Sequence, residues 1–430
     1  MITLHYTDSD FSDQLAAFCR TATAPKHIAD SVRDIISAIS ERGDAAIIEF
    51  LQKIDGVSLT PEELRVPAEQ LKAAADALSD ERRSAIEQAI ESVRAFHSEG
   101  LPRSWQGSNP HGALVGEKFY PIERVGIYTP GGQVPLASTI VMTATPAKLA
   151  GVPSVAAFTP PGKNGVDPNL LATYYLCGVR EVYRVGGPMA IAAAAYGTQS
   201  IPAVCKIFGP GNVYTNEAKR QVLGTVGIDI LAGTSEVMII CDESANPDYV
   251  AADLLAQAEH DPRVKLYLTI PSEAFLQTVL EEIGRQKATL RLQQNIDGTL
   301  EDGFLAIVCD SLDQAIDAAN RIAPEHLELH TEERTHMNLL EAIHTAGAIF
   351  MGHQTPTVLG DFAAGPNHTL PTGCTGRFYS GLQITDFMRR SSFVRYSRDN
   401  LIGATPIVRA FSAMEQLDAH GQSLEIRLRD

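Results

Sequence analysis

The periods of the apolar residues divide the chain into helical ends and two alternating central blocks. Between residues 27 and 98, apolar residues recur at spacings of three and four, which predicts amphipathic helices. From residue 124 to about 242, short β-branched runs alternate with alanine-rich stretches, and a second alternating block runs from about 247 to 351. This alternation is typical of βαβ units around a parallel sheet. We therefore predict an α/β protein with two Rossmann-like domains and small helical segments at both ends.

Nine short apolar runs are the expected strands of these blocks. In the first block they are Val125–Tyr128, Val155–Thr159, Val182–Val185, Val204–Phe208 and Glu236–Cys241. In the second block they lie near 264–269, 304–309, 326–330 and 347–351. Runs of this length, rich in β-branched residues, are typical of buried strands.

Four regions follow from this division. Residues 1–120 form a helical region that leads into a first α/β domain at 121–242, and a second α/β domain follows at 243–381. The end of the second domain, 352–381, is rich in Gly, Pro and Thr without a clear period, and loops of that length are usually functional or disordered. Residues 382–430 are mostly helical and too small to fold alone, so we expect them to dock on another surface.

Charge and cysteine content exclude several classes of partner. The 430 residues carry a formal net charge of −17, which repels phosphate backbones and anionic membranes, so we expect neither nucleic acid nor a membrane as a partner. No apolar run approaches the roughly 20 residues of a spanning helix, and no signal peptide is visible. The six cysteines are scattered without a CxxC pair. We therefore expect a reduced, cytoplasmic protein without a cysteine zinc site.

A predicted helix between Asn246-Pro247 and Pro262 carries the first candidate site. Asn and Pro are favoured at a helix start, and Pro262 stops the helix. Gln257 and His260 lie three residues apart on it and can offer an oxygen and a nitrogen to one metal ion. A hydrogen-bonded core glutamine beside a surface histidine is the more common outcome for such a motif.

Glu325 and His326 lie where a proline-terminated helix passes into the strand predicted at 326–330. On that strand Leu327 and Leu329 share one face, and His326 shares the other with two further polar residues. Imidazole is the usual proton acceptor near neutral pH, and a neighbouring carboxylate can activate water. Considered alone, this segment fits a polar strand start better.

Weaker signals occur in the long loop and near the C-terminus. Asp361 and His368 lie among glycines that allow a backbone to fold closely around a ligand, although turns use the same residues. Glu415 and His420 lie near the end of a predicted helix, where a His before a Gly is commonly a C-terminal cap.

Two glycine loops each follow a predicted strand and precede a helix. They are Tyr128–Gly132 and Phe208–Asn212, and Asn212 lies at a helix N-cap position. Either loop can bring backbone N–H groups to a phosphate. Neither is a GxGxxG, since Tyr214 occupies the third glycine position after Gly209 and Gly211. The dinucleotide fingerprints are therefore incomplete, and NAD cannot be assigned from them alone.

Taken together, these segments resemble the histidinol dehydrogenase family. The similarity runs from roughly residue 20 to 425. Its motifs occur in the order Arg124–Gly132, Phe208–Asn212, Glu217–Gln221, Gln257–His260, Pro324–Leu327 and Gly365–Pro371. Several long motifs in one order are far more specific than any of them alone.

The resemblance implies a role for each candidate residue. The implied zinc ligands are Gln257, His260, Asp361 and His420, and the implied catalytic pair is Glu325 and His326. The implied substrate contacts are Ser235, His368 and Glu415, besides His326 and the metal ligands. The implied cofactor contacts are Tyr128, Asn212 and the position of Met189, where the family has a Gln. Thr234 likewise replaces the family's usual Pro.

The reaction implied by the resemblance is the oxidation of L-histidinol to L-histidine through an aldehyde, the last steps of histidine biosynthesis. It uses NAD and one zinc ion per subunit, and the subunits form an intertwined homodimer whose active site both share. Met189 and Thr234 favour one alternative, a paralogue acting on another small alcohol. A zinc-dependent hydrolase that uses Glu325, and a catalytically silent metal-stabilised protein, are further alternatives.

Overall fold

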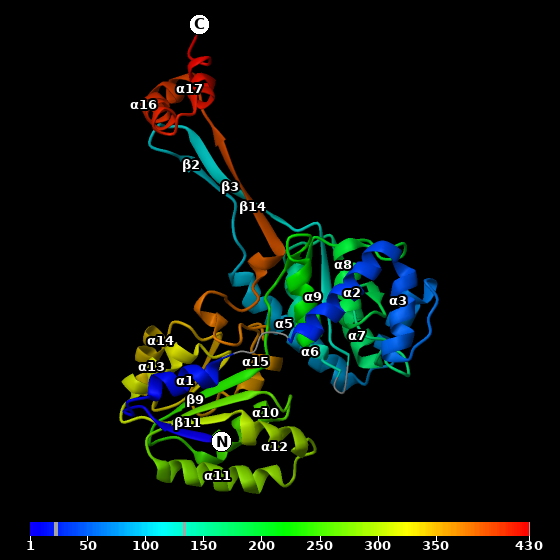
Figure 1. Cartoon of the computed structure of the whole chain (residues 1–430), viewed down its shortest axis with the longest axis vertical. Helices are drawn as coiled ribbons and strands as arrows, with labels where there is room; N and C mark the ends of the chain where they lie inside the picture. Colours follow the sequence, from blue (N-terminus) through cyan, green and yellow to red (C-terminus); the bar gives the residue numbers. More distant parts are fainter. Residues whose placement is uncertain (21–24, 132–134, 430) are drawn as a thin grey trace.

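A computed structural model describes residues 1–20, 25–131 and 135–429 of the chain. Two parallel sheets and one antiparallel sheet form its framework. Figure 1 shows the parallel sheets, each with its helices, in the body of the molecule, and the antiparallel sheet in a long arm that projects from it. The α/β class predicted from the sequence is confirmed by these parallel sheets.

The six-stranded parallel sheet has the order β1-β11-β10-β9-β12-β13. Its strands are β1 (Ile2–His5), β9 (Glu236–Cys241), β10 (Lys265–Ile270), β11 (Phe304–Val308), β12 (His326–His330) and β13 (Ala348–Met351). Helices α10 (Pro247–Ala258), α11 (Glu273–Lys287) and α12 (Gln293–Asp302) pack on one face. Helices α1 (Phe11–Cys19), α13 (Leu312–Ile322) and α14 (His336–Ala342) pack on the other. Alternate residues of each strand therefore enter two separate apolar cores.

The five-stranded parallel sheet has the order β6-β5-β4-β7-β8. Its strands are β4 (Arg124–Tyr128), β5 (Ser154–Phe158), β6 (Glu181–Tyr183), β7 (Lys206–Phe208) and β8 (Gly227–Ile228). One face is covered by α2 (Lys26–Arg42), α3 (Asp44–Phe50), α8 (Gly187–Tyr196) and α9 (Val213–Val222). The other is covered by α4 (Ala68–Asp76), α5 (Asp80–Glu99), α6 (Ala137–Leu149) and α7 (Pro168–Leu176). This sheet is thus also buried on both faces.

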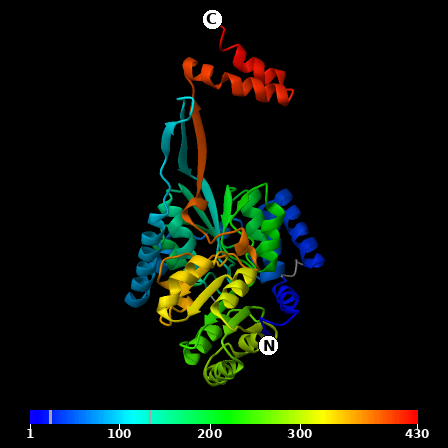
Figure 2. The ribbon, with the colours of Figure 1, turned by 90° about the vertical axis from the view of Figure 1, so that its left-hand side faces the viewer.

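The arm consists of an antiparallel sheet with two helices at its tip. Strands β2 (Trp105–Ser108), β3 (Leu114–Pro121) and β14 (Met388–Arg395) form the sheet in the order β14-β3-β2. Helices α16 (Arg398–Met414) and α17 (Asp418–Glu425) follow β14 and lie at the far end of the arm in both views (Figures 1 and 2). The C-terminal helices are therefore held away from the body of their own chain.

The structure corrects the predicted secondary structure at both ends. The region 1–120, predicted as helical, contributes β1 to the edge of the six-stranded sheet and β2 and β3 to the arm. The segment 382–430 begins with the eight-residue strand β14 rather than with a helix. β2 is exposed along its whole length and β14 along nearly all of it, so neither has the buried alternation by which strands are recognised. In the region that the structure describes, no helix is both long and apolar enough to cross a membrane.

A stacked pair of aromatic rings anchors the arm to the body. Phe387, directly before β14, is fully buried, and its ring centroid lies 4.1 Å from that of Phe208 at the end of β7. The backbone carbonyl of Phe387 accepts a hydrogen bond from the N–H of Ile122 at 2.9 Å. Lys206 Nζ donates to the carbonyl of Asp386 at 2.9 Å. The base of the arm is therefore fixed to β7 and to the segment that enters β4.

We expect Phe387→Ala to lower the free energy of unfolding by about 3–5 kcal/mol, because it leaves a cavity against Phe208. The matched control is Phe378→Ala, whose side chain is 72% exposed. The control should change the free energy of unfolding by less than about 0.5 kcal/mol. Denaturant unfolding of both variants measures the difference, and equal losses would contradict the anchoring role.

Candidate active site

Helix α10 carries Gln257 and His260 to the rim of a small cavity. The side chain of Asn246 caps its start by accepting from the N–H of Asp248 at 3.0 Å, as the sequence predicted. Gln257 is buried in the last turn, and His260 is exposed just beyond it. The cavity is lined by Asp253, Ala256, Gln257, His260, Glu328, Thr357, Val358 and Asp361. Residues from α10, β12 and α15 (Thr357–Phe362) therefore meet at one place.

Three of the predicted metal ligands line this cavity, and Asp361 is the one of the three that has a protein partner among the described residues. Among the residues that the structure describes, none makes a hydrogen bond or ion pair to the side chains of Gln257 or His260. Asp361 Oδ1 lies 3.7 Å from His368 Nδ1. The amide of Gln257 is not among the fully buried, unpartnered polar groups, and it borders the cavity, where it can serve as a ligand. An amide oxygen, an imidazole and a carboxylate fit a zinc ion.

Burial shifts the pKa values of the other groups around the cavity. Burial, together with the charge of Glu328, raises the pKa of Asp361 to about 6. Burial lowers the pKa of His368 to about 4, and the nearby rings of His326 and His260 lower it further. His326 and His260, two of the site residues predicted from the sequence, are thus close enough to His368 to affect its pKa.

The backbone of Glu236 positions the predicted catalytic pair. Its N–H donates to Glu325 Oε2 at 2.8 Å, and its carbonyl lies 3.1 Å from His326 Nδ1. β9 and β12 pair in parallel with His326 opposite Val237, which brings Glu236 beside the start of β12. Since a carbonyl can only accept, Nδ1 carries the proton and Nε2 keeps its lone pair. The fold thus selects the tautomer in which His326 can act as a base through Nε2.

Burial also determines the protonation of this pair. It lowers the pKa of His326 to about 4, so the ring is neutral at physiological pH. Burial raises the pKa of the Glu325 carboxyl well above its usual value, and the charges of Glu236 and Asp361 raise it further. A neutral imidazole and a carboxyl with a raised pKa suit proton transfer near neutral pH.

Glu236 was not predicted as a site residue. Its side chain is buried, burial raises its pKa to about 7, and its Oε1 accepts from the N–H of Gly373 at 3.1 Å. It therefore connects the long loop 352–381 to the catalytic pair. A contact made by the backbone cannot be predicted from the residue type. The one signal in the sequence was an acidic residue at the start of an apolar strand.

The remaining predicted substrate contacts lie in two different places. Ser235 is half-buried directly before β9, and its carbonyl accepts from the N–H of Lys265 at 3.2 Å. Glu415 and His420 are exposed on the helices at the tip of the arm (Figure 1). Within one chain, the structure does not bring these two residues to the cavity.

The predicted cofactor contacts lie at the carboxyl edge of the five-stranded sheet. The hydroxyl of Tyr128 accepts from the N–H of Gly187 at 3.2 Å, and Met189 is buried in the apolar core beside it. Asn212 caps α9 by accepting from the N–H groups of Tyr214 and Thr215, as the sequence predicted. Gly132, part of the first glycine loop, lies outside the described residues. Of these contacts, only Asn212 is exposed to a ligand in solution.

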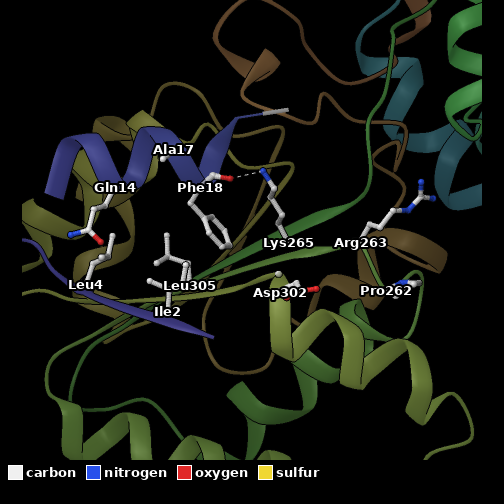
Figure 3. A pocket seen from close by; sticks show the side chains of 11 residues that line it. Ile2, Leu4, Gln14, Ala17, Phe18, Pro262, Arg263, Lys265, Asp302 and Leu305 are labelled. Atoms are coloured by element: carbon white, nitrogen blue, oxygen red, sulfur yellow. Dashed lines mark hydrogen bonds between the residues drawn. The ribbon is translucent and has the colours of Figure 1, made fainter. Parts of the chain in front are cut away.

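A second cavity, of about 630 Å³, lies apart from these residues between α1 and the edge strands of the six-stranded sheet (Figure 3). Leu4, Phe18, Lys265 and Leu305 line it, and Lys265 Nζ donates to the carbonyl of Phe18 at 2.7 Å. None of the predicted site residues lines this cavity. The candidate active site is therefore the smaller cavity lined by Gln257, His260 and Asp361.

Comparisons with known proteins agree with this geometry. The family model described as histidinol dehydrogenase matches residues 19–428. The chain belongs to the histidinol dehydrogenase family. The histidinol dehydrogenase of Syntrophotalea carbinolica is 42% identical over 429 residues, covering 99% of each chain. That of a Synechococcus strain is 44% identical over 402 residues, covering 93% of this chain and 92% of its own. The crystal structure of histidinol dehydrogenase from Elizabethkingia anophelis matches with a TM-score of 0.94 at 34% identity, covering 100% of this chain and 98% of that one.

Membership in the histidinol dehydrogenase family confirms the resemblance on which the sequence assignments relied. Three more polar residues of the cavity were not predicted: Asp253, Glu328 and Thr357. Spacing gave a signal for two of them. Asp253 lies one helical turn before Gln257, and Glu328 shares a strand face with His326.

We expect the stability of the folded chain to fall between pH 6.5 and 4 because His326 resists protonation. The unfolded chain binds a proton at this residue near pH 6.5, whereas the folded chain does so only near pH 4. This contribution is fully present above pH 6.5 and is lost as the pH falls through that range. Unfolding titrations should show a shallower pH dependence for His326→Asn, while His27→Asn, an exposed control, should follow the wild type.

Proposed function

We propose that this chain oxidises L-histidinol to L-histidine through histidinaldehyde, with NAD as the hydride acceptor and zinc as the bound metal. The observation that carries the proposal is the neutral His326, oriented by the Glu236 carbonyl and near His260, which shares a cavity with Gln257 and Asp361. Its near relatives carry the name of this activity over almost their whole length.

Gln257, His260 and Asp361 would hold the zinc ion together with His420 of a second chain. When bound, zinc supplies a Lewis-acidic anchor for the amine and imidazole nitrogens of an amino alcohol. His368, whose Nδ1 lies 3.7 Å from Asp361 Oδ1, and Ser235, directly before Glu236, would contact the substrate, as would Glu415 of the second chain. The proton transfers are assigned to His326 and Glu325.

His326 Nε2 takes the proton of the substrate hydroxyl while the carbon-bound hydrogen leaves as hydride to NAD, giving the aldehyde and one NADH. Glu325, as the carboxylate, next takes a proton from a water molecule, whose oxygen adds to the aldehyde carbon while His326 returns its proton to the carbonyl oxygen. This gives the hydrate and restores the neutral imidazole. A second loss of proton and hydride converts the hydrate into the carboxylic acid and gives a second NADH. The dry surroundings of both residues exclude water that would compete for these protons.

The NAD molecule would lie at the carboxyl edge of the five-stranded sheet. Asn212 lies there at the N-terminus of α9, where backbone N–H groups attract phosphate. Tyr128 and Met189 line the core below and would shape the floor of this site. Met189 in place of an amide removes one polar contact to the cofactor.

We further propose that the two parallel sheets are the cores of two Rossmann-like domains. The boundary expected at residue 242 is wrong for one strand, because β9 (Glu236–Cys241) pairs with β10 and β12 of the six-stranded sheet and so belongs to the second domain. Numbered in chain order, β4–β8 have the spatial order 3-2-1-4-5, and β9–β13 have the same order with β1 added at the edge. This is the order of doubly wound nucleotide-binding sheets.

A homodimer that shares its active sites is the assembly we propose. Glu415 ends α16 and His420 lies on α17, the two helices at the tip of the arm (Figure 2), and neither residue lines the cavity that they would complete. The arm also exposes large apolar side chains, among them Val394, Phe411 and Met414. Exposed apolar surface of this kind marks an interface.

The decisive experiment follows NADH absorbance with L-histidinol and NAD on the zinc-loaded protein. We expect two NADH per histidinol, and His326→Ala should lower kcat by about 10²- to 10⁴-fold through loss of the base. Gln257→Ala should lose activity with its zinc, whereas the exposed control His27→Ala should keep both. Zinc-loaded protein that oxidises only other small alcohols would favour the paralogue suggested by Met189 and Thr234.

Hybrid dimers test the shared site. A dimer of one Gln257→Ala chain and one His420→Ala chain, purified through two different tags, has one intact site if each site takes His420 from the partner. We expect about half of the wild-type activity for this hybrid, whereas each parent homodimer is inactive. A hybrid as inactive as its parents would show that each site is built from one chain.

A further inference from the structure

A buried cluster of two carboxylates and one imidazole lies directly behind the metal-binding cavity. His330 Nε2 lies 3.2 Å from Asp253 Oδ2 and 3.4 Å from Glu328 Oε2. The side chains of His330 and Glu328 are each only 1% exposed. Burial opposes a charge on His330, but Asp253 and Glu328 outweigh it and raise its pKa to about 9. The cluster is therefore a charged group enclosed in the protein.

Asp253 connects this cluster to the helix that carries two metal ligands. It lies four residues before Gln257, so these two side chains share one face of α10, and His260 follows just beyond the end of the helix. Asp253, Gln257 and His260 all line the same cavity. The contact from His330 to Asp253 thus fixes the rotation of α10 against β12.

Glu328 connects the cluster to the helix that carries the third ligand. Its Oε1 accepts from the N–H of Thr357 at 2.6 Å and from the Oγ1 of Thr357 at 2.5 Å. Thr357 is the first residue of α15, and Asp361 follows one turn later. One carboxylate therefore holds the start of α15 and, through its other oxygen, faces His330.

We propose that Asp253, His330 and Glu328 form a brace that positions the metal ligands of α10 and α15 relative to each other. This inference rests on the proposed zinc site at Gln257, His260 and Asp361. Asp253 and Glu328 line the cavity beside the proposed ligands, and the brace would act through the helices that it joins. Partners behind metal ligands commonly change metal affinity without being ligands themselves.

The brace is tested on the full-length protein with Glu328→Gln and Thr357→Val, using Thr335→Val as a matched control. The Oγ1 of Thr335 donates to the carbonyl of Glu332, away from the cavity. Zinc affinity is measured by competition with a chelator, ligand geometry by the absorption spectrum of the cobalt(II) protein, and folding by the melting temperature. A role confined to stability would change only the melting temperature.

We expect Glu328→Gln to raise the Kd for zinc by about 10- to 100-fold and to shift the cobalt spectrum, because the charge facing His330 is lost. Thr357→Val should weaken zinc binding less and in the same direction, and it keeps the test decisive if Glu328→Gln fails to fold. Thr335→Val should match the wild type.

Three outcomes would overturn the brace. If both variants bind zinc and cobalt as the wild type does, the brace fails while the proposed zinc site stands. If the wild type binds no zinc, or Gln257→Ala binds it unchanged, the proposed zinc site fails and the brace fails with it. If the wild type binds two zinc ions per chain and Glu328→Gln loses one, the cluster is itself a metal site.

Discussion

The backbone of Glu236 makes two hydrogen bonds at the start of β12, one to Glu325 and one to His326. Both depend on the parallel register of β9 and β12, which pairs His326 with Val237. A register shift of one residue would turn His326 into the apolar core that Leu327 and Leu329 now fill. The register of β9 and β12 therefore determines both the packing of the apolar core and the geometry of the catalytic pair. The same burial that stabilises the sheet also sets the protonation of the residues at its edge.

Burial acts in opposite directions on the two kinds of side chain at this site. It raises the pKa values of Glu325, Glu236 and Asp361, and it lowers those of His326 and His368. Both shifts favour the uncharged form. His330 is the exception, because two carboxylates face it and raise its pKa to about 9. The cluster around His330 is thus charged, whereas burial disfavours a charge on Glu325 and His326, the residues assigned to proton transfer.

Periodicity was sufficient to predict the elements that carry buried alternation. β12 occupies residues 326–330 as predicted, and α10 begins at Pro247 after the predicted cap. The arm could not be predicted in this way, since β14 pairs with β3 across more than two hundred residues of sequence, β14 is largely exposed, and β3 is mostly half-buried without alternation. β1 was missed because only Leu4 of its four residues is buried. In each case the missing information is a long-range pairing and not a local preference.

The arm also explains why Glu415 and His420 could be assigned to the site from the family resemblance, although one chain does not bring them to the cavity. Its tip is held by contacts within the arm itself: Asn400 Nδ2 donates to the carbonyl of His111 at 2.9 Å, and Asn109 Nδ2 donates to the hydroxyl of Tyr396 at 2.6 Å. Its base is held by the packing of Phe387 on Phe208. If the arm is rigid, a small rotation at its base displaces the helices at its tip, and the displacement increases with the length of the arm. In the shared site that we propose, the placement of His420 on the partner's metal therefore depends on an aromatic contact at the edge of the five-stranded sheet.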